Sequence, residues 1–173
     1  MCIRDRYIGL EPLNWVTAWV AITDSNEHNG CMRMWSGSHK DDLKDHKEKF
    51  NEVNLLTRGQ TVKDVPKEKT TPLILTAGQM SLHHPTVVHG SDLNKSDDRR
   101  IGFTIQSYIG ANVKQTLGKH GVQIARGKDN FNFHEKIGRS KLLMDENDIK
   151  LKKKENDNLQ EIFYKDAPKK GQL

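Results

Sequence analysis

The chain has 173 residues and a formal net charge of +5, and 34% of its residues are hydrophobic. This length is enough for one domain with a buried core, and the lack of a run of about 18 apolar residues predicts no membrane-spanning helix. Residues 136–173 hold ten Lys/Arg against seven Asp/Glu, which is +3 of the net charge. Since the rest of the chain is nearly balanced and has no basic patch with interleaved aromatics, nucleic acid is not an expected partner. Two cysteines without disulfide-type spacing, Cys2 and Cys31, indicate a reducing, cytoplasmic location.

Alternating side chains predict the first strands. Residues 15–23 (WVTAWVAIT) alternate with a period of two and are rich in aromatic and β-branched residues, which is typical of a strand. Asn29-Gly30 is a strong turn signal, after which residues 31–35 (CMRMW) are expected to pair back as a short strand. Residues 41–50 (DDLKDHKEKF) form a short charged helix at best.

The second half begins with short β segments and ends in a polar tail. Short β segments are expected at 72–76, 80–84 and 86–90, while residues 100–109 (RIGFTIQSYI) show the clearest strand alternation and 122–126 are a further candidate. After Gly138 the sequence becomes a Lys/Glu/Asp/Asn mixture with a weak helical stripe.

Many short strands with Gly, Asn and Pro turns predict a mainly β protein, an antiparallel sandwich or jelly roll. We expect one β domain over residues 1–135 with peripheral helices. Residues 136–173 are expected to be a charged C-terminal tail, either marginal helices packed outside or partly disordered.

Residues 81–102 (SLHHPTVVHGSDLNKSDDRRIG) combine metal-binding and anion-binding side chains. His89 ends a Val-Val segment before Gly90-Ser91, and Arg100 opens the next predicted strand. If that connection joins an antiparallel pair, His89 and Arg100 can point into one cavity. Imidazole suits divalent iron, and guanidinium presents a rigid fork of donors to a carboxylate. This is the combination that a chelating dicarboxylate needs.

Strand alternation ranks the neighbouring candidates. Arg99 is the alternative clamp, but it points to the opposite face from Arg100, so Arg100 is preferred. His83 and His84 alternate likewise, so at most one faces the metal, and each is expected to be structural or to support the ligand. Trp19 either borders the co-substrate pocket or is ordinary barrel packing, and both interpretations stay open.

Four segments carry a family resemblance: TAWVAITDSNEHNGCMRMWSGSHK, NLLTRGQ, AGQMSLHHPTVVHGSDLNKSDDRRIG and ARGKDNFNFH. In order and spacing, from about Tyr7 to His134, they resemble the phytanoyl-CoA dioxygenase family. Its members are iron(II)- and 2-oxoglutarate-dependent oxygenases on a double-stranded β-helix, a jelly-roll or cupin-like fold. The resemblance implies that His89 is the distal iron ligand and that Arg100 forms a salt bridge to the distal carboxylate of 2-oxoglutarate. It also implies that Ser91 hydrogen-bonds that carboxylate.

The remaining iron ligands of the family do not match. They form a His-x-Asp motif just before the equivalent of YIGLEP (7–12), where this chain has MCIRDR (1–6). Asp5 is the one carboxylate in this segment, and Ile3 rather than histidine stands two residues before it. We therefore expect residues 1–6 to be non-native, the oxygenase domain to be truncated at its N-terminus, and the chain as written to be inactive. The alternative is a genuine protein that has lost its metal.

The resemblance implies a full-length parent that uses Fe(II), 2-oxoglutarate and O2 to hydroxylate a small molecule or an acyl thioester. A halogenase of the same family, in which a small residue replaces the carboxylate, is one alternative. A non-catalytic β-sandwich module that holds an acidic ligand through Arg100 is another. Neither the substrate nor the oligomeric state follows from the sequence.

Overall fold

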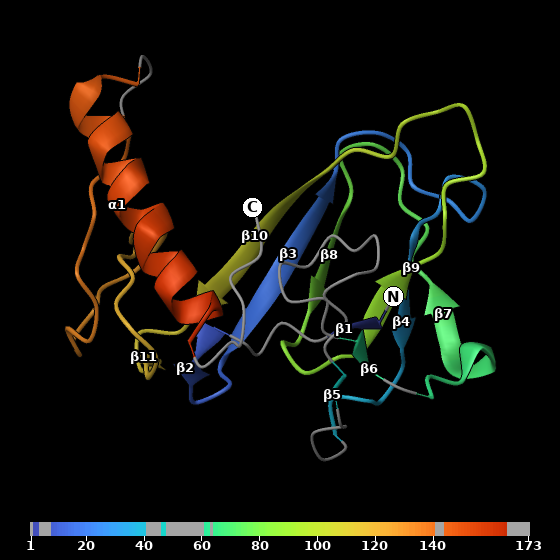
Figure 1. Ribbon diagram of the computed structural model, residues 1–173, viewed down its shortest axis with the longest axis horizontal. Helices are drawn as coiled ribbons and strands as arrows, with labels where there is room; N and C mark the ends of the chain where they lie inside the picture. The colour runs from blue at the N-terminus through green and yellow to red at the C-terminus, as the bar shows by residue number, and fades with distance from the viewer. Residues whose placement is uncertain are drawn as a thin grey trace. The chain divides into compact units, whose positions relative to one another are not determined.

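The computed structural model describes residues 2–3, 8–40, 46–47, 61–62, 64–140 and 144–165 (Figure 1). Short β-strands predominate, with 3-10 turns and one α-helix within these ranges. The elements in chain order are β1 (Cys2–Ile3), β2 (Leu10–Glu11), β3 (Trp15–Ala21), β4 (Met32–Trp35), β5 (His46–Lys47), β6 (Thr61–Val62), η2 (Lys67–Lys69), β7 (Thr70–Pro72), β8 (Met80–His83), β9 (His89–Ser91), β10 (Gly102–Ile109), β11 (Lys114–Gln115) and α1 (Glu146–Phe163). The prediction of a mainly β protein is confirmed.

The chain divides into two compact units. The first contains β1 and Trp15–Tyr108, and the second contains the described residues of Tyr7–Asn14 and Ile109–Lys170. In the first unit, four strands form a sheet in the order β1-β9-β4-β7, three form a second sheet in the order β10-β3-β8, and β5 pairs with β6. The pairs β1–β9, β4–β9, β4–β7 and β3–β8 are antiparallel.

The inward face of the β10-β3-β8 sheet carries polar and aromatic side chains. In the register between β3 and β8, Thr17 lies opposite His83 and Trp19 lies opposite Ser81, and all four residues are buried. A hydroxyl, an indole and an imidazole on a buried face are unusual in a structural core. The interior of the first unit is therefore equipped for binding polar groups.

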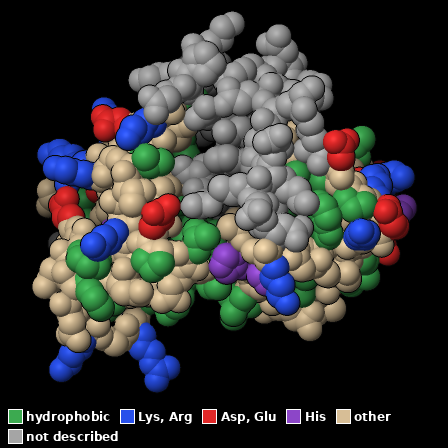
Figure 2. All heavy atoms as spheres, turned by 90° about the horizontal axis from the view of Figure 1, so that it is seen from below, with side chains coloured by type: hydrophobic (Ala, Val, Ile, Leu, Met, Phe, Trp, Pro, Cys, Tyr) green, Lys and Arg blue, Asp and Glu red, His purple; other side chains and the backbone are tan. Residues whose placement is uncertain are grey.

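The outward face of the same sheet is apolar and exposed. Its large side chains are Met80 and Leu82 of β8 and Phe103 and Ile105 of β10, and Phe103 and Leu82 are 59% and 61% exposed. We call these four residues the outer apolar face. On the view in Figure 2, hydrophobic side chains lie at the surface among charged and polar ones.

The strand at 102–109 confirms the clearest alternation in the sequence, but the expected pairing of residues 31–35 with 15–23 is wrong. β4 pairs with β7 and β9 in the other sheet. The turn at 24–30 explains this difference, because Asn29 donates from its side chain to the carbonyl of Asp24 and Gly30 has a φ of +74°. A Cβ at Gly30 would lie 2.7 Å from the carbonyl oxygen of Asp92, so the turn leads the chain across to the second sheet.

Two other predicted elements also differ. Residues 122–126 form no strand, and Val122 makes an isolated bridge to Lys136. Within residues 41–50, His46–Lys47 form β5 rather than helix, and the others lie outside the described residues. The expected segments at 72–76, 80–84 and 86–90 correspond to the shorter strands β7, β8 and β9.

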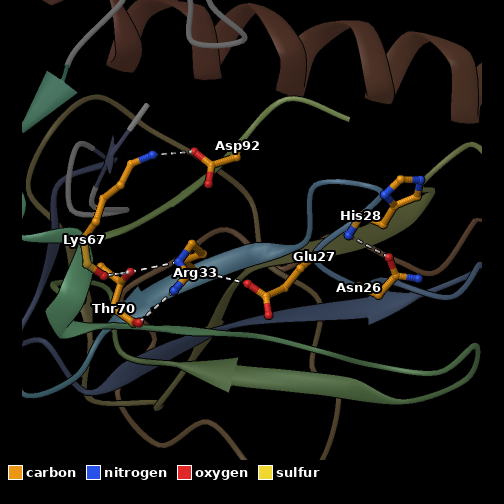
Figure 3. A network of polar contacts seen from close by, with 7 residues as sticks. All are labelled: Asn26, Glu27, His28, Arg33, Lys67, Thr70 and Asp92. Atoms are coloured by element: carbon orange, nitrogen blue, oxygen red, sulfur yellow. Dashed lines mark hydrogen bonds and ion pairs between the residues drawn. The ribbon is translucent and has the colours of Figure 1, made fainter. Parts of the chain in front are cut away.

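Side-chain bonds reinforce the edge of the larger sheet (Figure 3). Arg33 of β4 contacts Glu27 at 2.8 Å, and its guanidinium donates to the hydroxyl and carbonyl oxygens of Thr70 on β7 at 2.9 and 3.1 Å. Lys67 lies 3.3 Å from Asp92, just after β9. These contacts tie β7 and the segment after β9 to the same sheet.

In the second unit, β2 pairs with β11 and α1 supplies the helix. Asp145 caps α1 by accepting hydrogen bonds from the backbone N–H groups of Asn147 and Asp148. The buried Glu155 accepts from the N–H of Gly121 at 2.7 Å. Within the described ranges, no helix has both the length and the apolar character needed to cross a bilayer.

Candidate metal and dicarboxylate site

His89 begins β9 and is 7% exposed. Its Nδ1 lies 3.0 Å from the carbonyl oxygen of Val87. Because a carbonyl can only accept, Nδ1 is the donor of this bond. Histidines that bind metals are commonly oriented by such a bond to a backbone carbonyl. His89 therefore makes the orienting bond that is typical of a histidine ligand.

The residues before β9 fix the position of this imidazole. Val88 is buried and donates its N–H to the hydroxyl of Ser38 at 2.9 Å, while the N–H of Val87 donates to the carbonyl of His84. Pro85 is among the largest fully buried side chains. Although β9 has only three residues, these contacts fix the position of the residues that precede it.

Strand alternation separates His83 from His84, as the sequence predicts. His83 is 8% exposed, and its ring centre lies 4.9 Å from that of His89. His84 instead contacts the hydroxyl of Thr86 at 2.8 Å and lies 5.7 Å from His39, measured between ring centres. Thus His83 shares the interior with His89.

Arg100, Ser91 and Trp19 form one cluster. The guanidinium of Arg100 donates to the hydroxyl of Ser91 at 3.4 Å, near the long limit of a hydrogen bond, and its carbon lies 5.6 Å from the ring centre of Trp19. Cation–π attraction acts at this range. Arg99 is exposed. The structure thus brings together the three residues that the sequence singled out for an anion.

His89 and the cluster lie on the same side of β9. Ser91 is two residues after His89, and side chains at i and i+2 of a strand point to one face about 6.7 Å apart. Because Arg100 contacts the Ser91 hydroxyl, its guanidinium is on the His89 face. A five-carbon diacid is long enough to connect the two positions.

Burial lowers the pKa of the Arg100 guanidinium from its ordinary value, and the nearby Cys31 acts weakly in the opposite direction. A guanidinium keeps its charge at any physiological pH, so Arg100 is a partly desolvated cation. An incoming carboxylate would restore the stabilisation that the lost water provided.

The expected antiparallel pairing of the two strands that carry His89 and Arg100 is wrong. β9 and β10 belong to different sheets, and residues 92–101 cross from one sheet to the other. The crossing segment is internally bonded, since Asn94 donates to the carbonyl of Asp98 at 2.7 Å and accepts from the N–H of Ser96 at 2.8 Å. Arg100 therefore contacts Ser91 of β9 from the crossing segment, and not from a strand that is paired with β9.

The residues that the structure describes do not assemble the three-ligand iron set of the family. In the register between β1 and β9, position 3 pairs with His89. This position holds isoleucine, and an alkyl side chain has no atom that binds a metal. In the part of the chain that the structure describes, no group of three or more His, Cys, Asp or Glu could hold a metal ion.

The sequence missed two contributors to this site. Cys31 is a buried free thiol whose pKa is raised by burial and lowered in part by Arg100, and Ser38 supports the backbone next to His89. His83, which was expected to be structural or to support the ligand, lies beside His89. Only the Gly-Ser-His motif around Ser38 gave a local signal, because the proximity of Cys31 to Arg100 depends on how the sheets face each other.

Comparisons with known proteins point to one family. The family model described as phytanoyl-CoA dioxygenase (PhyH) matches residues 4–102. Among curated proteins, the peroxisomal phytanoyl-CoA dioxygenase of Bos taurus is 32% identical over 138 residues, which are 72% of this chain and 40% of that protein. A probable alpha-ketoglutarate-dependent hypophosphite dioxygenase of Stutzerimonas stutzeri is 30% identical over 109 residues, or 61% of this chain and 37% of that protein. The chain thus spans about two-fifths of the length of these relatives.

Solved structures support the same fold. The apo form of the non-heme monooxygenase ThoJ is 27% identical, with a TM-score of 0.80 over 94% of this chain and 59% of that protein. Its nickel complex is 25% identical, with a TM-score of 0.72 over 94% of this chain and 58% of that one. These neighbours confirm the predicted jelly-roll fold. Since the family model covers more than half of its residues, the chain belongs to the phytanoyl-CoA dioxygenase family.

Proposed function

We propose that this chain carries the co-substrate half of an Fe(II)- and 2-oxoglutarate-dependent dioxygenase that hydroxylates a small molecule or an acyl thioester. One observation carries the proposal: the half-buried Arg100 lies against Ser91 and Trp19 on the same side of β9 as His89. Family membership supports the same chemistry, and a relative with 30% identity is described as alpha-ketoglutarate-dependent.

Each residue of the cluster has a separate role in this proposal. Arg100 binds the distal carboxylate of 2-oxoglutarate, and the Ser91 hydroxyl donates a second hydrogen bond to it. Trp19 forms an apolar wall that keeps water away from the guanidinium and so strengthens its attraction for the anion. None of the three reacts. In the family, the redox chemistry is supplied by iron.

We further propose that the chain as printed does not turn over. Ile3 occupies the position opposite His89, and an alkyl side chain cannot bind a metal. A second candidate follows from the same observation: the chain acts as a non-catalytic module that holds an acidic ligand through Arg100. The two candidates differ in whether a ligand at position 3 produces activity.

A single substitution tests both candidates. Ile3→His places an imidazole at the position opposite His89 and two residues before Asp5 in the sequence. With Fe(II), 2-oxoglutarate and O2, we expect this variant to form succinate and the unaltered chain to form none. Succinate measured by chromatography gives the activity, and calorimetry gives 2-oxoglutarate binding.

Arginine substitutions in the Ile3→His variant test whether Arg100 binds 2-oxoglutarate. Arg100→Met should raise the KM for 2-oxoglutarate by about 100-fold, since loss of one partner of a buried charge pair costs 2–5 kcal/mol. Arg99→Met is the matched control, because Arg99 is the exposed neighbour, and it should leave KM unchanged. Binding without succinate in Ile3→His would favour the non-catalytic module. A larger effect of Arg99→Met than of Arg100→Met would contradict both candidates.

A further inference from the structure

The hydroxyl of Ser81 is buried in the first unit without a hydrogen-bond partner among the described residues. Ser81 is the second residue of β8 and is 9% exposed. Its Oγ neither donates to nor accepts from any described group. Buried polar side chains almost always have a partner, because burial removes the hydrogen bonds that water would otherwise provide. The Ser81 hydroxyl therefore calls for a partner from outside the chain.

Strand alternation and register place this hydroxyl on the face that carries Trp19. The neighbours of Ser81 in β8, Met80 and Leu82, are 58% and 61% exposed on the outer apolar face, so Ser81 points inward. In the register between β3 and β8, Ser81 lies directly opposite Trp19. Side chains at such positions share one face of the sheet, with Cβ atoms about 4.5–5.5 Å apart. The Ser81 hydroxyl therefore lies beside the Trp19 side chain.

Trp19 connects Ser81 with the positive charge of Arg100. The guanidinium carbon of Arg100 is 5.6 Å from the centre of the indole ring, and the guanidinium donates to the hydroxyl of Ser91. An anion held by Arg100 thus lies next to the indole that Ser81 flanks. Acceptor oxygens of 2-oxoglutarate stand at both ends of its five-carbon chain and on its keto group. One of them can therefore reach the Ser81 hydroxyl while the distal carboxylate stays on Arg100.

We propose that Ser81 is a further binding residue for 2-oxoglutarate and donates a hydrogen bond to one of its oxygens. A hydroxyl that donates to an ionised carboxylate makes a charge-assisted bond, which is stronger than a bond between neutral groups. Because the Ser81 hydroxyl has no partner among the described residues, ligand binding supplies a bond without breaking one. This inference rests on the proposed function, since it takes Arg100 as the anchor, and it adds a residue of β8 that was assigned no role from the sequence.

Removal of this hydroxyl should change affinity and stability in opposite directions. In calorimetric titrations with 2-oxoglutarate, Ser81→Ala should bind at least ~10-fold more weakly than the unaltered chain, the factor that corresponds to one hydrogen bond to a charged group. Without ligand, the thermal unfolding midpoint of Ser81→Ala should rise by about 2–4 °C, because the variant no longer buries an unpartnered hydroxyl. A hydroxyl that only supports the fold would instead lower the midpoint when it is removed.

Ser25→Ala is the matched control. The hydroxyl of Ser25 is also buried without a partner among the described residues, but Ser25 lies outside the named strands, at a bridge to Leu75. This variant should raise the midpoint and leave the affinity for 2-oxoglutarate unchanged. A lower midpoint in Ser81→Ala, or equal weakening of binding by both serine substitutions, would overturn the role of Ser81.

Arg100→Met separates this inference from the proposed function. If Arg100→Met weakens 2-oxoglutarate binding and Ser81→Ala does not, the role of Ser81 fails and the proposed function stands. Absence of binding by the unaltered chain, or binding that Arg100→Met leaves unchanged, would overturn both.

Discussion

The packing of Trp19 beside Arg100 depends on the absence of a side chain at Gly102. The indole of Trp19 lies directly against it, and a Cβ at position 102 would lie 2.0 Å from Cζ2 of Trp19. Such a distance is far below van der Waals contact, so the indole or the strand must move. The same indole lies beside Arg100, and the anchor therefore depends on this glycine.

Gly102→Ala should lower the free energy of unfolding by about 1–3 kcal/mol, the usual cost of adding a methyl group to a packed site. Urea unfolding followed by circular dichroism measures this loss, and tryptophan fluorescence should report the displaced indole. Gly138→Ala is the control, since a Cβ there meets nothing within 4 Å. Equal stability of the two variants would show that the indole packs elsewhere.

The buried thiol of Cys31 makes the stability of the protein depend on pH in the alkaline range. Burial raises the pKa of its thiol from the ordinary value, and Glu27 acts in the same direction, while Arg33 and Arg100 oppose them. A folded-state pKa above the unfolded one means that this contribution to stability is complete below the unfolded pKa and disappears as pH rises through the folded pKa. Unfolding free energy should therefore fall above about pH 9. Cys31→Ala should lack this part of the decline in urea titrations at several pH values, and parallel curves for both proteins would argue against it.

At the scale of single elements, the shortest strands depend on contacts outside themselves. β9 has three residues, yet it carries both His89 and Ser91, and its entry is fixed by the hydroxyl of Ser38. In contrast, β10 is eight residues long and its alternation was visible in the sequence. A short strand that is held by side chains from distant loops gives little local signal, which is why its length and partners were harder to predict.

α1 depends on its first turn. Asp145 accepts from two N–H groups that have no partner within the helix, so Asp145→Ala should destabilise the helix by about 1 kcal/mol. Thermal unfolding monitored at the helical circular dichroism band measures this effect. Asp157→Ala removes the same group from an exposed position inside α1 and should cost less. If Asp157→Ala proved as harmful as Asp145→Ala, charge rather than capping would be responsible.

At the scale of the whole molecule, the sequence predicted the fold class and the cluster of Arg100, Ser91 and Trp19, but not how the strands are distributed between sheets. Alternation shows which residues share one face of a strand, but it contains no information on which other strand is its neighbour in the sheet. For that reason β4 and β10 were assigned to the wrong neighbours, and the sequence could not tell which of His83 and His84 lies beside His89. The helix α1 was only weakly predicted because one of its two buried side chains is polar: besides Ile162 it buries Glu155, which binds the N–H of Gly121, and a search for apolar stripes overlooks such a contact.

The outer apolar face has a thermodynamic consequence. Met80, Leu82, Phe103 and Ile105 are between 42% and 61% exposed, so about half of the gain that full burial would give, normally about 25 cal/mol for each Å² covered, is not realised on this face. On the other face of the sheet, Trp19 is buried and also lies against Arg100. A substitution of this indole is therefore expected to alter ligand affinity and resistance to unfolding together.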